Sequence, residues 1–369
     1  MPGKEHIGTR QAAILVVYFA VGDMLLFLPS SMSSIVRQDA WISALIGLPI
    51  GIGLAWYIYW YSEKFPGRNL IGIHTLVLGR WLGGIVSLLY LGAFFNNSVV
   101  TIREIGDFVT TQMMTETPMR VICLLMIILS VIVIRSGLEN IARSAEFFFP
   151  LYLLMLTTMV IFLLPEAHIA KLTPVMENGF QTLAEGVVYY VTFPFAEMFV
   201  FWMIFPHILK NKHLKRDYLL GVTIAGVIIF AMILMSLLVL GPYLTKHQMY
   251  STYTLAKKVN IGHFVQRLEA IMALTWIMST FMRSIIYGYA FIKGVSDLLK
   301  LRDYRPLTIP LGVTMFGYAV IVSPHVVYMN AINPYWILWD LTYVPVISIL
   351  VFLIYRIKLR WGRGSSPSK

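Results

Sequence analysis

Long apolar runs separated by short polar segments recur along the whole chain. Each run approaches the roughly 20 residues that an α-helix needs to cross a bilayer. The pattern therefore predicts ten transmembrane helices, at about 11–34, 40–61, 81–101, 119–135, 141–164, 181–207, 218–242, 264–292, 306–324 and 335–355. Between them, the segment from Ser62 to Arg80 has apolar residues near helical spacing. This segment predicts a helix lying in the membrane interface, with an ordinary connecting loop as the alternative.

The composition supports an all-α integral membrane protein. Of the 369 residues, 58% are hydrophobic and 13% are charged, against roughly 25% charged in a soluble domain. The one cysteine, Cys123, excludes a disulfide framework within the chain and a cysteine-cluster metal site. No histidine cluster, phosphate-binding loop or nucleophile elbow is present. We therefore expect no metal, no cofactor and no catalytic residues, so the chain is not expected to be an enzyme.

The net charge of +11 is explained by topology. Basic residues lie in the short loops between apolar runs, where they report orientation. An even number of helices places both termini on one side, and the positive-inside rule makes that side the cytoplasm. The basicity thus predicts no nucleic-acid partner.

The spacing of the runs predicts an internal repeat. Pairing the starts of helices one to five with those of six to ten gives an offset that grows smoothly from about 170 to about 194 residues, as expected for an inverted-topology transporter repeat. An odd number of helices in each half inserts the second half upside down. We therefore expect one transporter-like domain over 1–369, with repeat 1 at about 11–164, repeat 2 at about 181–356 and a short cytoplasmic tail at 357–369.

Transporters of this architecture bind ligand where the first helix of each repeat is interrupted. The first run carries Gly22 and Asp23 at its middle, and the sixth run carries Thr192-Phe193-Pro194-Phe195 followed by Glu197. Glycine frees the backbone and proline removes a backbone donor, so both positions predict broken helices. The alternative is that Gly22 is a packing notch and Pro194 a tolerated kink.

Further polar residues flank these predicted breaks. Asn96 and Asn97 lie in the third run and Ser279 in the eighth, where they could bind a ligand or bond between helices. The residues predicted to bind a ligand are Gly22, Asp23, Asn96, Asn97, Thr192, Phe193, Pro194, Phe195, Glu197 and Ser279.

Buried charges are expected to pair, because an isolated charge at membrane depth is costly. Arg283 lies in the eighth run and could pair with Asp23, Glu197 or Asp340. Structural pairing of Arg283 is favoured over ligand binding. At the start of the fifth run, Glu139, Arg143 and Glu146 share a helical face and predict an ion-pair ladder. A membrane anchor is favoured for this ladder over an ion-pair gate.

Several motifs occur in order along nearly the whole chain. They are Ile7-Gly8-Thr9-Arg10-Gln11, Phe65-Pro66-Gly67, Leu78-Gly79-Arg80-Trp81-Leu82-Gly83, Gly137-Leu138-Glu139 with Arg143, Leu172-Thr173-Pro174-Val175 with Glu177-Asn178-Gly179, and Phe193-Pro194-Phe195-Ala196-Glu197. The ordered set resembles the GerAB type of spore germination protein. That family is similar to permeases of the amino acid-polyamine-organocation superfamily, with ten helices where many permeases have twelve.

The resemblance implies a fold and a function. The implied fold is a LeuT/APC-like 5+5 inverted repeat with helices 1 and 6 broken. The implied function is that of the B-type subunit of a nutrient germinant receptor in the spore inner membrane, partnered by an A-type membrane subunit and a C-type lipoprotein. Such a subunit senses a nutrient, commonly an amino acid, and the receptor then releases ions.

Asp23 departs from what a site for a zwitterionic amino acid would carry beside the break. It indicates a ligand with extra positive charge, or a role for Asp23 in binding a cation. Besides the receptor subunit, the sequence leaves open an autonomous amino-acid or ion-coupled permease using the same site. A polytopic membrane enzyme is disfavoured because no acid-base or metal constellation is found.

Overall fold

The computed structural model describes residues 5–177, 179–258, 268–324 and 326–363. These residues form helices, and within them the only extended pairing is one parallel bridge between Ile7 and Ile208. The first half contains α1 (Thr9–Val21), α2 (Met24–Val36), α3 (Ala40–Glu63), α4 (Leu70–Gln112), α5 (Met119–Ser136) and α6 (Leu138–Leu163). The second half contains α7 (Gly179–Phe195), the 3₁₀ helix η4 (Ala196–Met203), α8 (Leu214–Leu240), α9 (Pro242–His247), α10 (Ser251–Lys258), α11 (Leu268–Leu298), α12 (Thr308–Ile321), α13 (Val326–Leu341) and α14 (Ser348–Arg363).

Long apolar helices dominate the described chain. Eight stretches are long and apolar enough to cross a membrane: Met24–Glu63, Leu70–Gln112, Met119–Ser136, Leu138–Glu166, Gly179–Met203, Leu214–Leu240, Leu268–Leu298 and Tyr335–Arg360. With α1 and α12, which are apolar but shorter, they overlap all ten predicted runs, and the first residues of the eighth run, 264–267, lie outside the described residues. The chain is a multi-pass membrane protein, while the count of ten spans stays a prediction.

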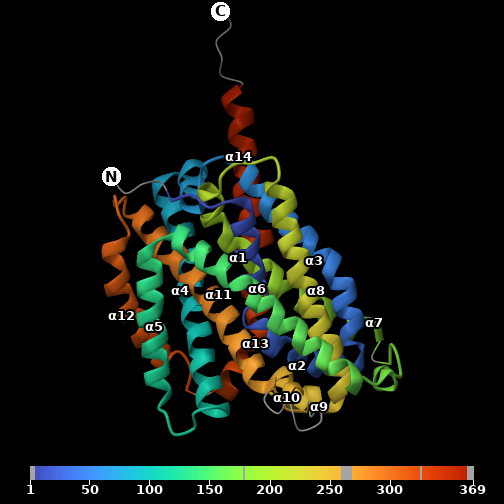
Figure 1. The fold of residues 1–369 in the computed structure, drawn as a ribbon. Coiled ribbons are helices and arrows are strands. Elements are labelled where there is room, and N and C mark those ends of the chain that lie inside the picture. The colour runs from blue at the N-terminus through green and yellow to red at the C-terminus, as the bar shows by residue number, and fades with distance from the viewer. Residues whose placement is uncertain (1–4, 178, 259–267, 325, 364–369) are drawn as a thin grey trace, which may run out of the picture.

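The bundle has a centre and an outer layer (Figure 1). In the most apolar part of each stretch, 89% of the residues are buried for Gly179–Met203, against 22% for Leu138–Glu166. The stretch formed by α7 and η4 is therefore central, and α6 faces outward over much of its length. α1 is also central, since it packs against α6, α8 and α11. The two helices predicted to break thus lie where other helices surround them.

The packing agrees with two related halves. α3 packs against α8 and α4 against α11. These are the pairs that the predicted repeat equates, since they correspond to helices two and seven and to helices three and eight. In Figure 1, α1 begins and α14 ends at one end of the bundle, whereas α9 and α10 lie at the opposite end. An even number of crossings is consistent with that arrangement.

The segment between α3 and the third span contains the expected helix. Helix α4 begins at Leu70, where the Asn69 side chain accepts a hydrogen bond from the backbone N–H of Gly72 at 3.0 Å. At Gly79 the backbone leaves helical geometry, with φ of 82°. The short helix before Gly79 is therefore distinct from the long one after it, as the sequence predicts. Its position in the membrane interface stays a prediction.

The expected cytoplasmic tail at 357–369 stays a prediction, and its residues 364–369 lie outside the described residues. Helix α14 continues to Arg363, and Lys358 Nζ donates a hydrogen bond to the Val77 carbonyl at 2.7 Å. Much of the expected tail is thus a continuation of the last helix that is anchored to the short helix before Gly79.

Candidate functional site

The first helix is interrupted at Gly22 and Asp23. Gly22 has φ of 21° and ψ of −126°, and its N–H closes α1 by donating to the Tyr18 carbonyl at 2.9 Å. Side chains of α11 donate hydrogen bonds to the carbonyl groups that the break leaves free. Ser279 Oγ donates to the Gly22 carbonyl at 3.1 Å, and Trp276 Nε1 donates to the Asp23 carbonyl at 3.3 Å. Because freed backbone groups at membrane depth must be satisfied internally, α11 stabilises the break.

The second interruption follows the predicted motif. α7 continues through Pro194 to Phe195, and the chain then narrows into the 3₁₀ helix η4 at Ala196. Pro194 thus lies inside the last turn of α7, two residues before the change of helix type. The sequence correctly predicts that this helix is broken, but the break begins at Ala196 and not within Thr192–Phe195. Glu197 lies in the first turn of η4.

Arg283 of α11 joins the two breaks. Its Nε lies 3.0 Å from Asp23 Oδ1, its Nη2 lies 2.5 Å from Glu197 Oε2, and its Nη1 donates to the Phe19 carbonyl at 2.8 Å. The Nε–Oδ1 contact is an ion pair whose angle does not suit a hydrogen bond. The guanidinium also lies 4.7 Å from the centre of the Phe19 ring. Arg283 is 1% exposed, so these partners replace its water shell.

Tyr287 completes the environment of Glu197 by donating its hydroxyl hydrogen bond to Oε2. Glu197 therefore accepts from two groups of α11, and η4 is held against that helix. The sequence left the partner of Arg283 open among Asp23, Glu197 and Asp340. The structure pairs Arg283 with the first two, and Asp340 forms no ion pair with any described residue, so the expected charge pairing of Asp340 is wrong.

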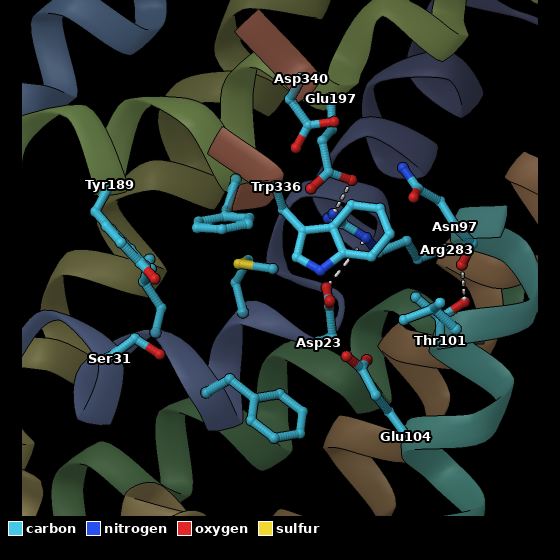
Figure 2. Close-up of a pocket in the computed structure, with 15 residues that line it drawn as sticks. Asp23, Ser31, Asn97, Thr101, Glu104, Tyr189, Glu197, Arg283, Trp336 and Asp340 are labelled. Carbon is cyan, nitrogen blue, oxygen red and sulfur yellow. Dashed lines mark hydrogen bonds and ion pairs between the residues drawn. The ribbon is translucent and has the colours of Figure 1, made fainter. Parts of the chain in front are cut away.

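A cavity of about 80 Å³ lies next to these ion pairs (Figure 2). Asp23, between α1 and α2, and residues of α2, α4, α7, η4, α11 and α13 surround it. They are Asp23, Met24, Phe27, Leu28, Ser31, Asn97, Val100, Thr101, Glu104, Tyr189, Phe193, Glu197, Arg283, Trp336 and Asp340. We call this cavity the break pocket, because both interruptions border it.

The break pocket collects part of the predicted site. Of the ten residues predicted to bind a ligand, four line it: Asp23, Asn97, Phe193 and Glu197. Gly22 and Ser279 do not line it, but they contact each other through Ser279 Oγ and the Gly22 carbonyl, and Gly22 precedes Asp23 in the chain. The assignment of these residues to ligand binding stays a prediction.

The other predicted residues point elsewhere. Asn96 borders a different groove, where its Oδ1 accepts a hydrogen bond from Tyr318 at 3.0 Å. The hydroxyl of Thr192 donates to the Val188 carbonyl within α7, at 2.8 Å. Phe195 packs against Tyr190 with ring centres 5.7 Å apart. These side chains hold the helices together and do not line the break pocket.

Sequence reasoning missed Glu104, Thr101, Tyr189 and Trp336, which line the pocket. A signal for two of them was present, because Thr101 and Glu104 follow Asn97 by four and seven residues and so share its helical face. Arg103 beside Glu104 obscured it by marking the end of a span. Arg103 in fact turns away, and its Nε pairs with Asp107 Oδ1 at 3.0 Å.

The predicted ladder on α6 forms only in part. Arg143 pairs with Glu139. Glu146 instead lies 3.5 Å from Arg10 Nε and accepts a hydrogen bond from Gln11 Nε2 at 3.0 Å. The expected pairing of Glu146 with Arg143 is therefore wrong, because Glu146 binds Arg10 and Gln11 at the start of α1 instead.

Comparison with known proteins relates this sequence to spore germination proteins. The sequence model of a family described as spore germination protein matches residues 6–326. Spore germination protein KB of Bacillus subtilis (strain 168) is 27% identical over 325 residues, which cover 87% of this chain and 86% of that protein. Spore germination protein B2 of the same strain is 21% identical over 376 residues, covering 99% of each chain.

Solved structures show the same fold at low sequence identity. MhsT in complex with L-phenylalanine matches with a TM-score of 0.70 and 12% identity, over 97% of this chain and 90% of that one. Mhp1, a nucleobase-cation-symport-1 family transporter in a closed conformation with bromovinylhydantoin bound, matches with a TM-score of 0.60 and 14% identity, over 95% and 75% of the two chains. The fold is thus the LeuT-like transporter fold, built on an inverted repeat with broken helices 1 and 6.

Proposed function

Because this chain belongs to the spore germination protein family, as a protein of the GerAB type, we propose that it is the B-type subunit of a nutrient germinant receptor in the spore inner membrane. In this proposal a small nutrient binds in the break pocket and triggers germination with ion release. An A-type membrane subunit and a C-type lipoprotein are its partners, and both termini face the cytoplasm. The resemblance implies an amino acid as the nutrient, and this expectation stays a prediction.

The observation that supports the proposal is the break pocket itself. It is small, it lies between the two interrupted helices, and Arg283 connects both interruptions on its wall. A ligand shifts a conformational equilibrium only by the difference between its affinities for the two states. A molecule that contacts both breaks at once meets this condition, because any relative movement of α2 and η4 changes its contacts.

The second candidate function is an autonomous permease that carries its ligand across the membrane. The observation in its favour is the fold, since both solved relatives described above have a transporter fold and MhsT holds L-phenylalanine. Uptake of a labelled nutrient by vesicles containing this chain alone would support the permease. Uptake that is absent, together with germination that depends on the chain, supports the receptor.

The test of the receptor proposal uses neighbouring asparagines of α4. Asn97→Leu removes a polar group from the break pocket, whereas Asn96→Leu makes the same change in the groove beside Tyr318. Spores carrying Asn97→Leu should need about tenfold more nutrient for half-maximal germination, as loss of one hydrogen bond to the ligand implies. Asn96 Nδ2 donates to Asn97 Oδ1 at 3.3 Å, so Asn96→Leu removes that bond but leaves the Asn97 amide in the pocket, and these spores should need a clearly smaller increase in nutrient than Asn97→Leu spores.

Germination is followed as loss of optical density over a nutrient series, and the amount of protein is measured by immunoblot. Spores lacking the chain should fail to answer at least one nutrient. A normal response of such spores to every nutrient tested would contradict the receptor proposal. An unchanged response of Asn97→Leu spores with normal protein abundance would place the binding site outside the break pocket.

A further inference from the structure

The break pocket is unbalanced in charge. Asp23, Glu104, Glu197 and Asp340 border it, and Arg283 is the one Arg or Lys among the described residues that do so. In Figure 2, Asp340 lies on the side of Glu197 and Glu104 on the side of Asp23, with Arg283 between them. A carboxylate buried without a counter-charge is costly, so an excess of acidic groups creates a demand for positive charge.

The guanidinium of Arg283 does not meet this demand. Its three nitrogens already contact Asp23, Glu197 and the carbonyl of Phe19 at 3.0, 2.5 and 2.8 Å. Its single positive charge is therefore already matched by two carboxylates of the protein, and it leaves no unpaired positive charge for the carboxylate of a ligand. This distinguishes the pocket from one suited to a zwitterion, which requires a partner for each of its charges.

Two acidic atoms on the wall remain without a partner. Asp340 Oδ1 and Glu104 Oε2 are shielded from solvent and accept no hydrogen bond from the described residues. The Asp340 residue is 2% exposed. The unsatisfied atoms border the same cavity from α13 and from α4, so a donor placed in it can reach acceptors on two helices.

The size and the remaining lining of the pocket select among cations. A volume of about 80 Å³ holds about six water-sized groups. Met24, Phe27, Phe193 and Trp336 present apolar and aromatic surface to it. Among the described residues no group of three or more histidine, cysteine and acidic side chains is arranged to hold a metal ion. Aromatic faces and alkyl groups suit an organic ammonium ion, whereas a bare metal cation prefers a shell of oxygens.

We propose that the break pocket binds a small organic amine or diamine that carries no carboxylate, with its ammonium groups held by Asp340 and Glu104. This inference rests on the proposed function, because it names the chemical class of the nutrient sensed there. It also gives a different role to Asp23 from that expected from the sequence: Asp23 neutralises Arg283, and the two other carboxylates attract the ligand.

The test compares four probes that match in their number of non-hydrogen atoms and differ in charge. They are 1,4-diaminobutane, n-pentylamine, L-alanine and butanoate. Binding is measured by calorimetry on the full-length chain in lipid nanodiscs, together with any subunits that copurify from spore membranes. The diamine or the monoamine should bind at least tenfold more tightly than L-alanine, and butanoate should show no saturable binding.

A charge variant tests the assignment to particular residues. Asp340→Asn keeps the shape and removes one carboxylate, and it should weaken binding of 1,4-diaminobutane at least tenfold. Glu104→Gln gives the same readout if Asp340→Asn does not accumulate. The matched control is Glu185→Gln, which removes one negative charge from an exposed position on α7 outside the pocket. This control should bind the diamine like the parent.

Three results would overturn the proposal. The first is binding of L-alanine or butanoate as tightly as the amines, and the second is absence of binding by all four probes. The third is displacement of the diamine by potassium ions at a constant ionic strength held with a bulky cation, which would identify an inorganic cation as the ligand. None of these depends on germination, so failure of the amine class is distinct from failure of the receptor proposal, which spores lacking the chain decide.

Discussion

Arg283 shows how one side chain can set the electrostatics of a membrane site. It is buried, and it compensates two carboxylates that come from different halves of the chain, Asp23 and Glu197. The planar guanidinium reaches both acids and the Phe19 carbonyl at once because its donors point in different directions. Lysine has a single point of charge and cannot make all three contacts.

Replacing Arg283 by lysine should therefore destabilise the protein. A buried ion pair that loses one partner costs about 3 to 5 kcal/mol, and Arg283→Lys should lose a large part of that. Arg143→Lys changes the same residue types in the exposed pair with Glu139, where the effect should be about 0.5 kcal/mol or less. Thermal unfolding of the purified variants measures both effects. Equal shifts in melting temperature for the two variants would mean that Arg283 stabilises the fold no more than the exposed Arg143 does.

The sequence could predict that Arg283 pairs but not with which acid. Burial of a charge in an apolar run requires a partner, and that requirement is visible in the residue types alone. The choice among Asp23, Glu197 and Asp340 depends on how far α11 is rotated about its axis, which the sequence does not encode locally. For this reason the sequence could not show that Asp340 Oδ1 accepts no hydrogen bond from the described residues.

At the scale of elements, the central feature is the interruption between α1 and α2. Only glycine suits position 22, for two reasons: its φ is positive, and there is no space around it for a side chain. A Cβ atom at Gly22 would lie 2.5 Å from Arg283 Cδ and 2.9 Å from the Phe19 carbonyl oxygen. Any side chain there would strain the backbone and displace the guanidinium, so the break and the ion pairs depend on the same residue.

Gly22→Ala should impair nutrient sensing, because even a single added methyl group does not fit at this position. A non-glycine residue in such a conformation costs about 1 to 3 kcal/mol, and displacement of Arg283 adds to it. We expect at least a tenfold increase in the nutrient concentration needed for half-maximal germination. The matched control is Gly53→Ala in α3, where a Cβ atom meets nothing within 4 Å. A normal response in Gly22→Ala spores would show that the geometry of this break is not required.

The two interruptions differ in how well residue types predict them. A glycine followed by an aspartate is unfavourable inside a helix that crosses the membrane, so the pair predicts a helix end, and α1 ends at that point. Pro194 lies inside α7 although it lacks the N–H that would bond the Tyr190 carbonyl, since helices at membrane depth tolerate proline among neighbouring helices, and the change to 3₁₀ geometry comes after Phe195. Local chemistry indicates that a helix is disturbed, while neighbouring helices decide at which residue it changes.

At the scale of the whole molecule, the segment Glu5–Gly8, which we call the N-terminal strap, ties together helices from both halves. Ile7 pairs with the chain after η4, donating to the His207 carbonyl at 3.0 Å and accepting from Leu209 N–H at 2.9 Å. Glu5 Oε2 accepts from the Leu138 N–H at 3.0 Å. The strap therefore closes the end of the bundle at which α1 begins.

Two tyrosines and an arginine complete the site of Glu5. The hydroxyl of Tyr289 donates to its Oε2 at 3.3 Å and that of Tyr304 to its Oε1 at 3.1 Å, while Arg305 Nη2 lies 3.7 Å from Oε1. Burial and the adjacent Glu5 carboxylate raise the pKa of Tyr304, so its hydroxyl stays a donor at neutral pH. One acid thus joins α6, α11 and the segment before α12.

Glu5→Ala should loosen this end of the bundle. Loss of a carboxylate that accepts several hydrogen bonds costs about 1.5 to 3 kcal/mol, so hydrogen exchange in the segment 137–141 should accelerate about tenfold or more. Mass spectrometry of the exchanged protein measures this effect. Glu146→Ala is the control, since Glu146 binds the start of α1 but does not contact the strap. Equal exchange in parent and Glu5→Ala would contradict a closing role for the strap.

The strap also has a consequence for biosynthesis. The partners of Glu5 at Leu138, Tyr289 and Tyr304 follow it by 133, 284 and 299 residues. At about 5 to 20 residues per second, the ribosome produces the last of them roughly 15 to 60 s after Glu5 itself. The strap is therefore translated long before its last partners, and its contacts with Tyr289 and Tyr304 can form only after α11 has been made. A protein fused ahead of the strap would be present throughout that interval and would act on the final step of assembly.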